Sequence, residues 1–418
     1  MTTKQGMRPT AGIVAAVSIV VAVGIALTTV SPVQAAEPGS VRFATFNASL
    51  NRSAAGQLIT DLSTPANAQA ANVAEIIQRT APDVVLINEF DYDEAGTALQ
   101  LFQDNYLSVP HNGAPAIDYA YSYTAPSNTG VPSGFDLNND GSVGGPDDAF
   151  GFGFFPGQFG MAVYSRYPID VEAIRTFQTF RWKDMPGALL PDDPNTPEPA
   201  DFYSAAELEV FRLSSKSHWD LPLQVGRHTV HFLVSHPTPP VFDGVEDRNG
   251  RRNSDEIRLW ADYITVADSA YIYDDDGVYG GLPRGAHFVV AGDQNSDPLD
   301  GDSVPGSIEQ LLDDPRVNTN RTPDSIGAVQ ASAQQGGANQ THLSPPRFDT
   351  ADFSDAQPGN LRVDYLLPST TLSIRSSAVF WPPVYNSLHR LVYDPNFPFG
   401  VASSDHRLVR TDLRISGT

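Results

Sequence analysis

Short apolar segments bounded by turn residues, each with a polar side chain at or near one end, constrain this chain more than any other feature. They read VRFATFN, DVVLINEF, FGMAVYSRYPI, HTVHFLVSHP, HFVVAGDQN, LRVDYLLPS and HRLVRTDLRI. Each holds a run of about five to eight mostly apolar residues, which predicts a β-strand buried on both faces or nearly so.

Two segments between these strands have the periodicity of amphipathic helices. Val73, Ile76 and Ile77 share one face of a helix predicted within residues 66–80, and residues 254–270 repeat the pattern. Strands interspersed with helices predict an α+β fold in which stacked sheets are covered by helices.

The first 36 residues have the features of an export signal. Two basic residues precede an apolar run at residues 11–30, and Val33 and Ala35 are the small residues that signal peptidase requires. We expect residues 1–36 to be removed, which makes the protein secreted and extracellular with no stable membrane association. The run is long enough for an uncleaved N-terminal anchor to be the alternative.

Residues 37–418 are long enough for one large domain with a full hydrophobic core. Two stretches, at about residues 92–158 and 300–359, contain few strand signals, and both are rich in polar and turn residues. We interpret them as insertions on a single domain, because neither shows a convincing core of its own.

The composition excludes several classes of site. The chain has a formal net charge of −23, which argues against a broad basic face for nucleic acid. It has no cysteine, so disulfides, thiolate metal sites and cysteine nucleophiles are excluded. A bound metal ion can still make the electrostatic potential locally positive within an acidic protein.

Side chains that bind metals or transfer protons stand at or near one end of six predicted strands. They are Asn47, Glu89, His236, Asp293, Asn295, Asp364, Asp405 and His406. Singly, such residues are most often turns or solvated strand ends. Together they predict one site, because the ends of adjacent strands converge in space, and Asp293 and Asn295 are two apart, on one face of an extended segment.

The series TFNASL, LINEF, GMAVYSRYPI, SHPTPP, GDQN, RVDYLL and SDHRLV resembles the endonuclease/exonuclease/phosphatase superfamily, which has the DNase I-like fold. The resemblance covers nearly all of residues 37–418 outside the insertions. It implies a four-layer α/β/β/α sandwich, with two mixed β-sheets packed face to face and helices outside. The chain departs from many relatives at VSHPTPP and at Gln294, where an aromatic residue is common.

The resemblance also implies a metal site. Glu89 would bind a divalent cation, helped by Asn47 and Asp405. Hard oxygen ligands of this kind suit Mg²⁺ or Mn²⁺.

The remaining strand-end residues would be catalytic. Asp293 would orient or deprotonate the attacking water, and Asn295 would fix the phosphate. His236 and His406, the latter polarised by Asp364, would contact the phosphate oxygens. The sequence leaves open whether Asp293 or the Asp364–His406 pair is the general base.

Three arginines stand just ahead of the second predicted helix, which Asn253 or Ser254 could cap. Arg248 and Arg251 in particular could bind a substrate phosphate, since guanidinium groups pair with phosphate oxygens. The alternative is a solvated loop whose arginines pair with neighbouring acids.

The stretch DLNNDGSVGGPDDAF, within the first insertion, matches the start of a calcium-binding loop. Asp136, Asn138 and Asp140 occupy its first three ligand positions, Ser142 would offer its carbonyl group, and Asp147 would replace the usual Glu. We expect structural Ca²⁺ at residues 136–147; the alternative is a flexible turn.

The function that these features favour is a secreted, metal-dependent phosphoesterase acting on small organic diesters or monoesters by attack of water. The first alternative is an extracellular nuclease that cleaves DNA or RNA, and the second is a catalytically inactive binding module of the same fold. No G-x-S-x-G, P-loop or H-E-x-x-H motif points to another chemistry. Substrate identity, the metal used and the oligomeric state are left open.

Overall fold

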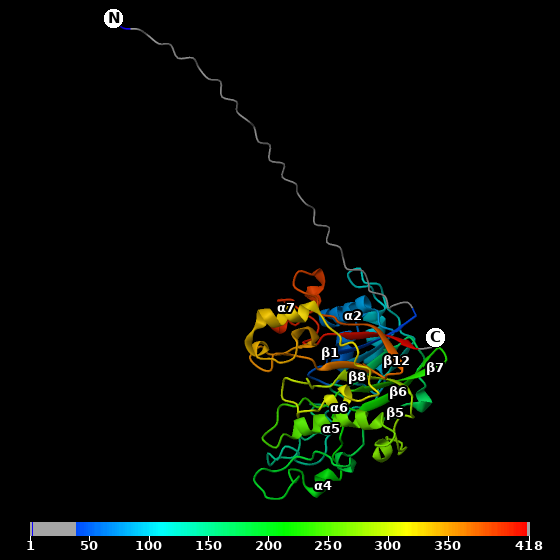
Figure 1. Cartoon of the computed structure of the whole chain (residues 1–418), viewed down its shortest axis with the longest axis vertical. Coiled ribbons are helices and arrows are strands. Elements are labelled where there is room, and N and C mark those ends of the chain that lie inside the picture. Colours follow the sequence, from blue (N-terminus) through cyan, green and yellow to red (C-terminus); the bar gives the residue numbers. More distant parts are fainter. Residues whose placement is uncertain (1, 3–38, 416–418) are drawn as a thin grey trace. The chain divides into compact units, whose positions relative to one another are not determined.

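The computed structural model describes residue 2 and residues 39–415, and in the latter range two β-sheets pack face to face (Figure 1). Apart from residue 2, the predicted signal peptide lies outside the described residues. Among the described helices, none combines the length and hydropathy that a membrane crossing requires.

The first sheet has six strands in the order β12-β13-β1-β2-β4-β3. Their bounds are β1 Val41–Leu50, β2 Val84–Phe90, β3 Tyr121–Tyr123, β4 Met161–Ser165, β12 Leu372–Val379 and β13 Val409–Ile415. The sheet is mixed, because β1 and β2 are parallel whereas the other pairs are antiparallel.

The second sheet has five strands in the order β11-β8-β7-β6-β5. Their bounds are β5 Arg175–Thr176, β6 His218–Val225, β7 His228–Ser235, β8 His287–Asp293 and β11 Asp364–Pro368. It is also mixed, with β7 and β8 parallel. A small ribbon joins β9 Ala351–Asp352 to β10 Asn360–Leu361.

The described helices are mostly short. They are α1 Gln57–Leu62, α2 Ala68–Thr80, α3 Thr97–Phe102, α4 Ala205–Leu208, α5 Arg248–Tyr263, α6 Glu309–Leu312 and α7 Ile326–Gln335. A π-helical turn, η1 Gln103–Leu107, continues α3. The 3₁₀ turns are η2 Val171–Ala173, η3 Trp182–Asp184, η4 Ser269–Tyr271, η5 Gly337–Gln340, η6 Pro346–Phe348, η7 Ser387–Leu391 and η8 Pro398–Gly400.

Strand alternation sorts the buried side chains into three hydrophobic layers. Phe43 on β1 and Phe232 on β7 meet between the sheets, with ring centroids 5.5 Å apart. The next β1 residue, Ala44, faces outward into the core that α2 covers, and Leu233 faces the core that α5 covers. Residues that alternate between two buried faces need cover on both sides, so the predicted four-layer α/β/β/α sandwich is confirmed.

All seven predicted strand segments contain a strand, but β3, β5, β6, β9 and β12 lie outside them. Of the two long strands among these, β6 carries Asp220 and Pro222, and β12 carries three serines and an arginine, so neither has an apolar run. Both predicted insertions contribute to the main layers: Phe102 of α3 joins the core under α2, and Ala328 of α7 joins the core between the sheets.

Helix α5 begins at Arg248, and the prediction that Asn253 or Ser254 caps it is wrong. Asp243 supplies the missing acceptor earlier in the chain, because its carboxylate accepts the backbone N–H of Asn249 at 2.7 Å. Asn253 is instead buried one turn into the helix, where its side-chain amide donates to the carbonyl groups of Thr238 and Gln294.

Gly292, the penultimate residue of β8, allows this strand to approach β7 closely. Its φ of +145° disfavours other residues, and a Cβ there would lie 2.0 Å from the carbonyl oxygen of Ser235.

We expect Gly292→Ala to lower the free energy of unfolding by about 2–4 kcal/mol, since backbone strain and a steric clash add up. Chemical denaturation with circular dichroism measures the loss. Gly187→Ala is the matched control, because Gly187 has φ +64° but open space around it, so strain alone should cost about 1 kcal/mol. Equal effects of the two substitutions would contradict the close approach.

Candidate active site

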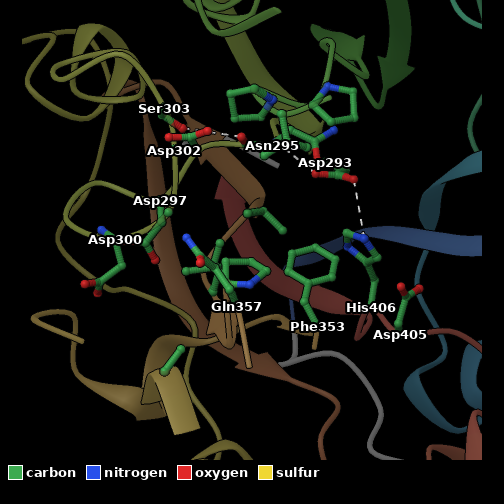
Figure 2. A pocket seen from close by; sticks show the side chains of 18 of the residues that line it. Asp293, Asn295, Asp297, Asp300, Asp302, Ser303, Phe353, Gln357, Asp405 and His406 are labelled. Atoms are coloured by element: carbon green, nitrogen blue, oxygen red, sulfur yellow. Dashed lines mark hydrogen bonds and ion pairs between the residues drawn. The ribbon is translucent and has the colours of Figure 1, made fainter. Parts of the chain in front are cut away.

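A cavity of about 890 Å³ lies where the predicted strand ends meet (Figure 2). The predicted residues that line it are Glu89, His236, Asp293, Asn295, Asp405 and His406. Asn47 and Asp364 are buried and hydrogen-bond to these residues. The structure therefore brings together all eight strand-end residues from segments that span more than 350 positions of the sequence.

Glu89 is turned into the cavity by an irregularity at the ends of β1 and β2. The register of this parallel pair shifts between Asn47 and Leu50, and Ser49 and Glu89 both have positive φ values, +48° and +58°. The Glu89 carboxylate accepts hydrogen bonds from the side-chain amides of Asn47, at 3.2 Å, and Asn51, at 2.7 Å. Amide donors thus fix an acid whose conformation is locally costly.

Asp293, the last residue of β8, is the buried centre of the site. Its Oδ2 accepts a hydrogen bond from the Asn47 amide at 3.1 Å and lies 3.3 Å from His236 Nε2 and 3.6 Å from His406 Nε2. Burial acts to raise the pKa of Asp293, but the charge of His406 and the nearby His236 imidazole outweigh it and hold that pKa well below its usual range. Asp293 is therefore a carboxylate at neutral pH.

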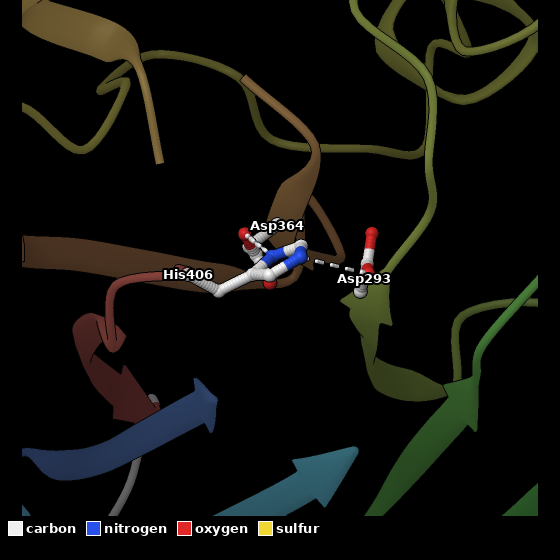
Figure 3. Close-up of side chains that lie close together, drawn as sticks. All are labelled: Asp293, Asp364 and His406. Carbon is white, nitrogen blue, oxygen red and sulfur yellow. Dashed lines mark hydrogen bonds and ion pairs between the residues drawn. The ribbon is translucent and has the colours of Figure 1, made fainter. Parts of the chain in front are cut away.

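His406 lies between Asp293 and Asp364 (Figure 3). Its Nδ1 is 2.9 Å from Asp364 Oδ2, which also accepts the Thr350 hydroxyl at 2.8 Å. Burial opposes protonation of His406, but the two carboxylates raise its pKa well above the usual value. Burial raises the pKa of Asp364 to about 6, although the charge of His406 acts in the opposite direction. At neutral pH an imidazolium is thus held between two carboxylates.

Asn295 reaches the same cavity by a turn rather than along an extended strand, so the reasoning that placed it on one face with Asp293 is wrong. Strand β8 ends at Asp293, and Asn295 has φ +51°. The turn is fixed because Asp293 Oδ1 accepts the Asn295 N–H at 2.9 Å and the Asn295 amide donates to the Pro237 carbonyl at 3.1 Å.

The predicted metal ligands present oxygen atoms without cationic partners. Glu89 and Asp405 both line the cavity, and within residues 39–415 neither forms an ion pair. Asp405 Oδ1 accepts the hydroxyl of Ser49 at 3.3 Å. Two carboxylates that line one cavity and form no ion pair fit a hard divalent cation. Asn47 turns its amide nitrogen to the acids, while its oxygen accepts the Ser49 N–H, so its role as a ligand stays a prediction.

Asp293, Asp364 and His406 also offer ligand atoms that lie within 4.8 Å of one another. They could hold a metal ion by distance alone. However, His406 already occupies the space between the two acids as their charge partner, which favours a hydrogen-bonded triad there.

The three arginines predicted to lie just ahead of the second helix have different environments in the structure. Arg248 pairs with Glu246 and lines a second cavity beside Glu89, whereas Arg251 lines neither cavity. Arg252 is buried and donates to the carbonyl groups of Leu213 and Phe150, so it has a structural role.

The predicted calcium loop is closed by its own hydrogen bonds. Asp136 accepts the N–H groups of Asp140 and Gly141, and Asn138 accepts that of Asp140 as well. Asp140 accepts the N–H of Ser142. Within the described residues, the acids of this loop, Asp147 included, do not gather into a group with ligand atoms within 4.8 Å of one another. Calcium binding here stays a prediction.

Three residues of the site were missed by sequence reasoning. Asn88 accepts the Asp293 N–H at 3.2 Å, Asn51 holds Glu89, and Thr350 holds Asp364. Asn88 and Asn51 are polar residues adjacent to predicted strand ends, which was an available signal. Thr350 lies within the second predicted insertion, where nothing in the sequence distinguishes it.

Comparison with known proteins identifies a family. The sequence model of the Endonuclease/Exonuclease/phosphatase family matches residues 44–406. No curated protein sequence matches the chain.

Solved structures similar to this chain include an endonuclease/exonuclease/phosphatase from Beutenbergia cavernae DSM 12333, at 17% identity over 90% of this chain and 72% of that one, with a TM-score of 0.47. Sphingomyelinase C from Streptomyces griseocarneus is 15% identical over 89% of this chain and 99% of its own, with a TM-score of 0.45. Beta toxin from Staphylococcus aureus is 13% identical over 89% of this chain and 99% of its own, with a TM-score of 0.43.

We expect Asp364→Asn to lower the pKa of His406, because the substitution removes one of the two negative charges that favour the imidazolium. Titration of the imidazole resonances by NMR measures this change. The imidazole resonances of His231, which pairs with Asp220 on β6, are the internal control and should be the same in the variant and the unsubstituted protein. An unchanged His406 would show that Asp364 does not set its charge.

Proposed function

This chain belongs to the endonuclease/exonuclease/phosphatase family, and we propose that it is a secreted, divalent-metal-dependent phosphoesterase that hydrolyses phosphoester bonds by attack of water. The observation that carries the proposal is the convergence of four carboxylates, two amides and two imidazoles at one cavity. Phosphoester hydrolysis requires these three kinds of group: metal ligands, a proton acceptor and donors to the phosphate oxygens.

Glu89 and Asp405, with Asn47, would hold the cation. Mg²⁺ or Mn²⁺, when bound, would neutralise negative charge on the phosphate oxygens. Their oxygen ligands and the lack of any thiol suit these two ions.

Asp293 is best suited to accept the proton of the attacking water. Its carboxylate is ionised, whereas His406 is already protonated and so serves as a donor. Of the two candidate bases left open by the sequence, the charge states therefore favour Asp293.

The donors to the phosphate would be His406 and the Asn295 amide, with His236 beside them. Burial and the charge of Lys216 lower the pKa of His236, so this imidazole is neutral. It would orient Asp293 through Nε2, since its Nδ1 is buried without a hydrogen-bond partner among the described residues.

Export and structural calcium belong to the same proposal. The features of residues 1–36 support secretion, and the spacing of Asp136, Asn138 and Asp140 supports Ca²⁺ in the first insertion.

We expect Asp293→Asn to lower kcat about 10²–10⁴-fold, because the variant has no carboxylate to accept the proton. Steady-state kinetics with Mg²⁺ or Mn²⁺ and a chromogenic phosphoester measure the loss. Asp313→Asn is the control, since Asp313 is an exposed acid that lines neither this cavity nor the second one beside Glu89. Turnover close to that of the unsubstituted enzyme in a folded Asp293→Asn variant would remove Asp293 from the mechanism.

We expect Glu89→Gln to weaken Mn²⁺ binding at least about tenfold, since a neutral amide replaces a charged ligand. Titration followed by the electron paramagnetic resonance of free Mn²⁺ measures the affinity without any turnover. Glu94→Gln, in the loop after β2, is the control. Equal Mn²⁺ affinity in the two variants would place the metal elsewhere.

A substrate panel separates the alternatives. Nicking of plasmid DNA or cleavage of RNA at rates above those for small esters would establish the nuclease. Mn²⁺ binding without hydrolysis of any ester would favour the inactive binding module.

A further inference from the structure

Helix α5 holds the segment that carries His236 through a carboxylate that has no part in the proposed chemistry. This acid, Glu256, is fully buried. Its Oε1 accepts the backbone N–H of Ser215 and its Oε2 accepts that of Thr238, both at 2.6 Å. Ser215 precedes β6 and Thr238 follows β7, so one side chain joins two segments that lie outside the strands of the sheet.

Asn253 completes this attachment from the same face of α5, because residues three apart on a helix are neighbours. Its side-chain amide donates to the carbonyl groups of Thr238, at 2.8 Å, and Gln294, at 2.9 Å. Both backbone polar groups of Thr238 are therefore held by α5. The same contacts tie the segment after β7 to the segment after β8, where Gln294 follows Asp293 directly.

The His236 ring depends on this attachment because its side chain has little support of its own. Nε2 lies 3.3 Å from Asp293 Oδ2, whereas Nδ1 is buried and has no hydrogen-bond partner within residues 39–415. A ring with so few polar contacts is directed mainly by its backbone. That backbone is held at two points, because the His236 carbonyl accepts the Ser215 hydroxyl at 3.4 Å and Thr238 is fixed by Glu256.

The charge of Glu256 is balanced inside the chain. Burial lowers the pKa of Lys216 and the pKa of Arg252, and the negative charge of Glu256 opposes this change in both. A buried carboxylate is tolerated when it is paired, and a charged acceptor forms stronger hydrogen bonds than a neutral one. Glu256 lines neither cavity, so it has the properties of an anchor and not of a group that meets the substrate.

We propose that Glu256, together with Asn253, is a positioning residue: it fixes the backbone around His236 so that the imidazole orients the Asp293 carboxylate. The inference rests on the proposed function and adds to it a residue that acts only through others. Glu256 would affect turnover because it determines where a neighbour of the proton acceptor lies.

Glu256→Gln replaces one carboxylate oxygen by an NH₂ group, which cannot accept the hydrogen bond of a backbone N–H. We expect kcat to fall at least about tenfold with KM changed less than about twofold, because misplacement of a catalytic group by about 1 Å can cost about a hundredfold. Steady-state hydrolysis of bis(p-nitrophenyl) phosphate or p-nitrophenyl phosphate, whichever is the faster substrate, measures both constants with Mg²⁺ or Mn²⁺.

Asp255→Asn is the matched control. Asp255 is the preceding residue of α5 and is also buried, and its Oδ2 accepts the indole N–H of Trp182 and the backbone N–H of Leu189, both at 2.6 Å. Neither partner belongs to the site, so this substitution should change kcat less than about twofold. Equal losses of kcat in the two variants would reduce Glu256 to a purely structural role.

A double-mutant cycle separates positioning from general stability. If Glu256 acts through His236, Glu256→Gln should lower kcat less than about threefold in a His236→Ala background. The same loss in both backgrounds would overturn the inference. Glu256→Asp keeps the charge beside Lys216 and Arg252 but is one methylene shorter, so it takes the place of Glu256→Gln in the cycle if a thermal melt shows that the latter does not fold.

A measurement without turnover separates this inference from the proposed function. We expect Glu256→Gln to shift the imidazole ¹H and ¹⁵N resonances of His236 in NMR spectra, and Asp255→Asn to leave them in place. Unshifted His236 resonances in folded Glu256→Gln would overturn the inference even in an active enzyme. Absence of phosphoester hydrolysis by the unsubstituted protein would overturn the proposed function, and the resonances would still decide whether Glu256 positions His236.

Discussion

The charge pairing of His406 with Asp293 and Asp364 is the interaction on which the rest of the site depends. Asp293 ends β8 and Asp364 begins the adjacent strand β11 of the same sheet, whereas His406 precedes β13 of the other sheet. A buried carboxylate costs several kcal/mol unless it is paired, and two such acids side by side repel each other. The imidazolium between them removes both penalties and ties the edges of the two sheets together.

The backbone is irregular at three positions that shape the site. Glu89 and Asn295 adopt positive φ values at the ends of buried strands, and Gly292 permits the close approach of β8 to β7. Such conformations persist only where surrounding contacts determine them. Here hydrogen bonds from Asn47 and Asn51 hold Glu89, and the Asp293 carboxylate holds Asn295. The regular sandwich thus makes the site rigid, and the irregular strand ends determine where the side chains of the site point.

The sequence predicted the strands and the polar residues at their ends because both leave local signals. An apolar run that stops at an acid or amide is visible within ten residues, as in VVAGDQN. Features set by distant contacts were not visible. The start of α5 depends on Asp243, the support of Asp364 depends on Thr350, and β6 is buried despite Asp220 because His231 and Tyr263 satisfy that carboxylate.

The residues that would act on the phosphate and the residues that form the cavity walls lie in different parts of the fold. The groups that would act on the phosphate stand on or next to strand ends, whereas the walls of both cavities come from the segments between strands. Phe152 and Asp147 belong to the first predicted insertion, and Asp300 and Phe353 belong to the second. Loops tolerate change more readily than the elements they connect. A phosphate site fixed by the sandwich can therefore keep its reaction while the insertions determine which groups may flank the phosphorus atom. In this chain the first insertion contributes Phe152 to one cavity and the second contributes Asp300 to the other.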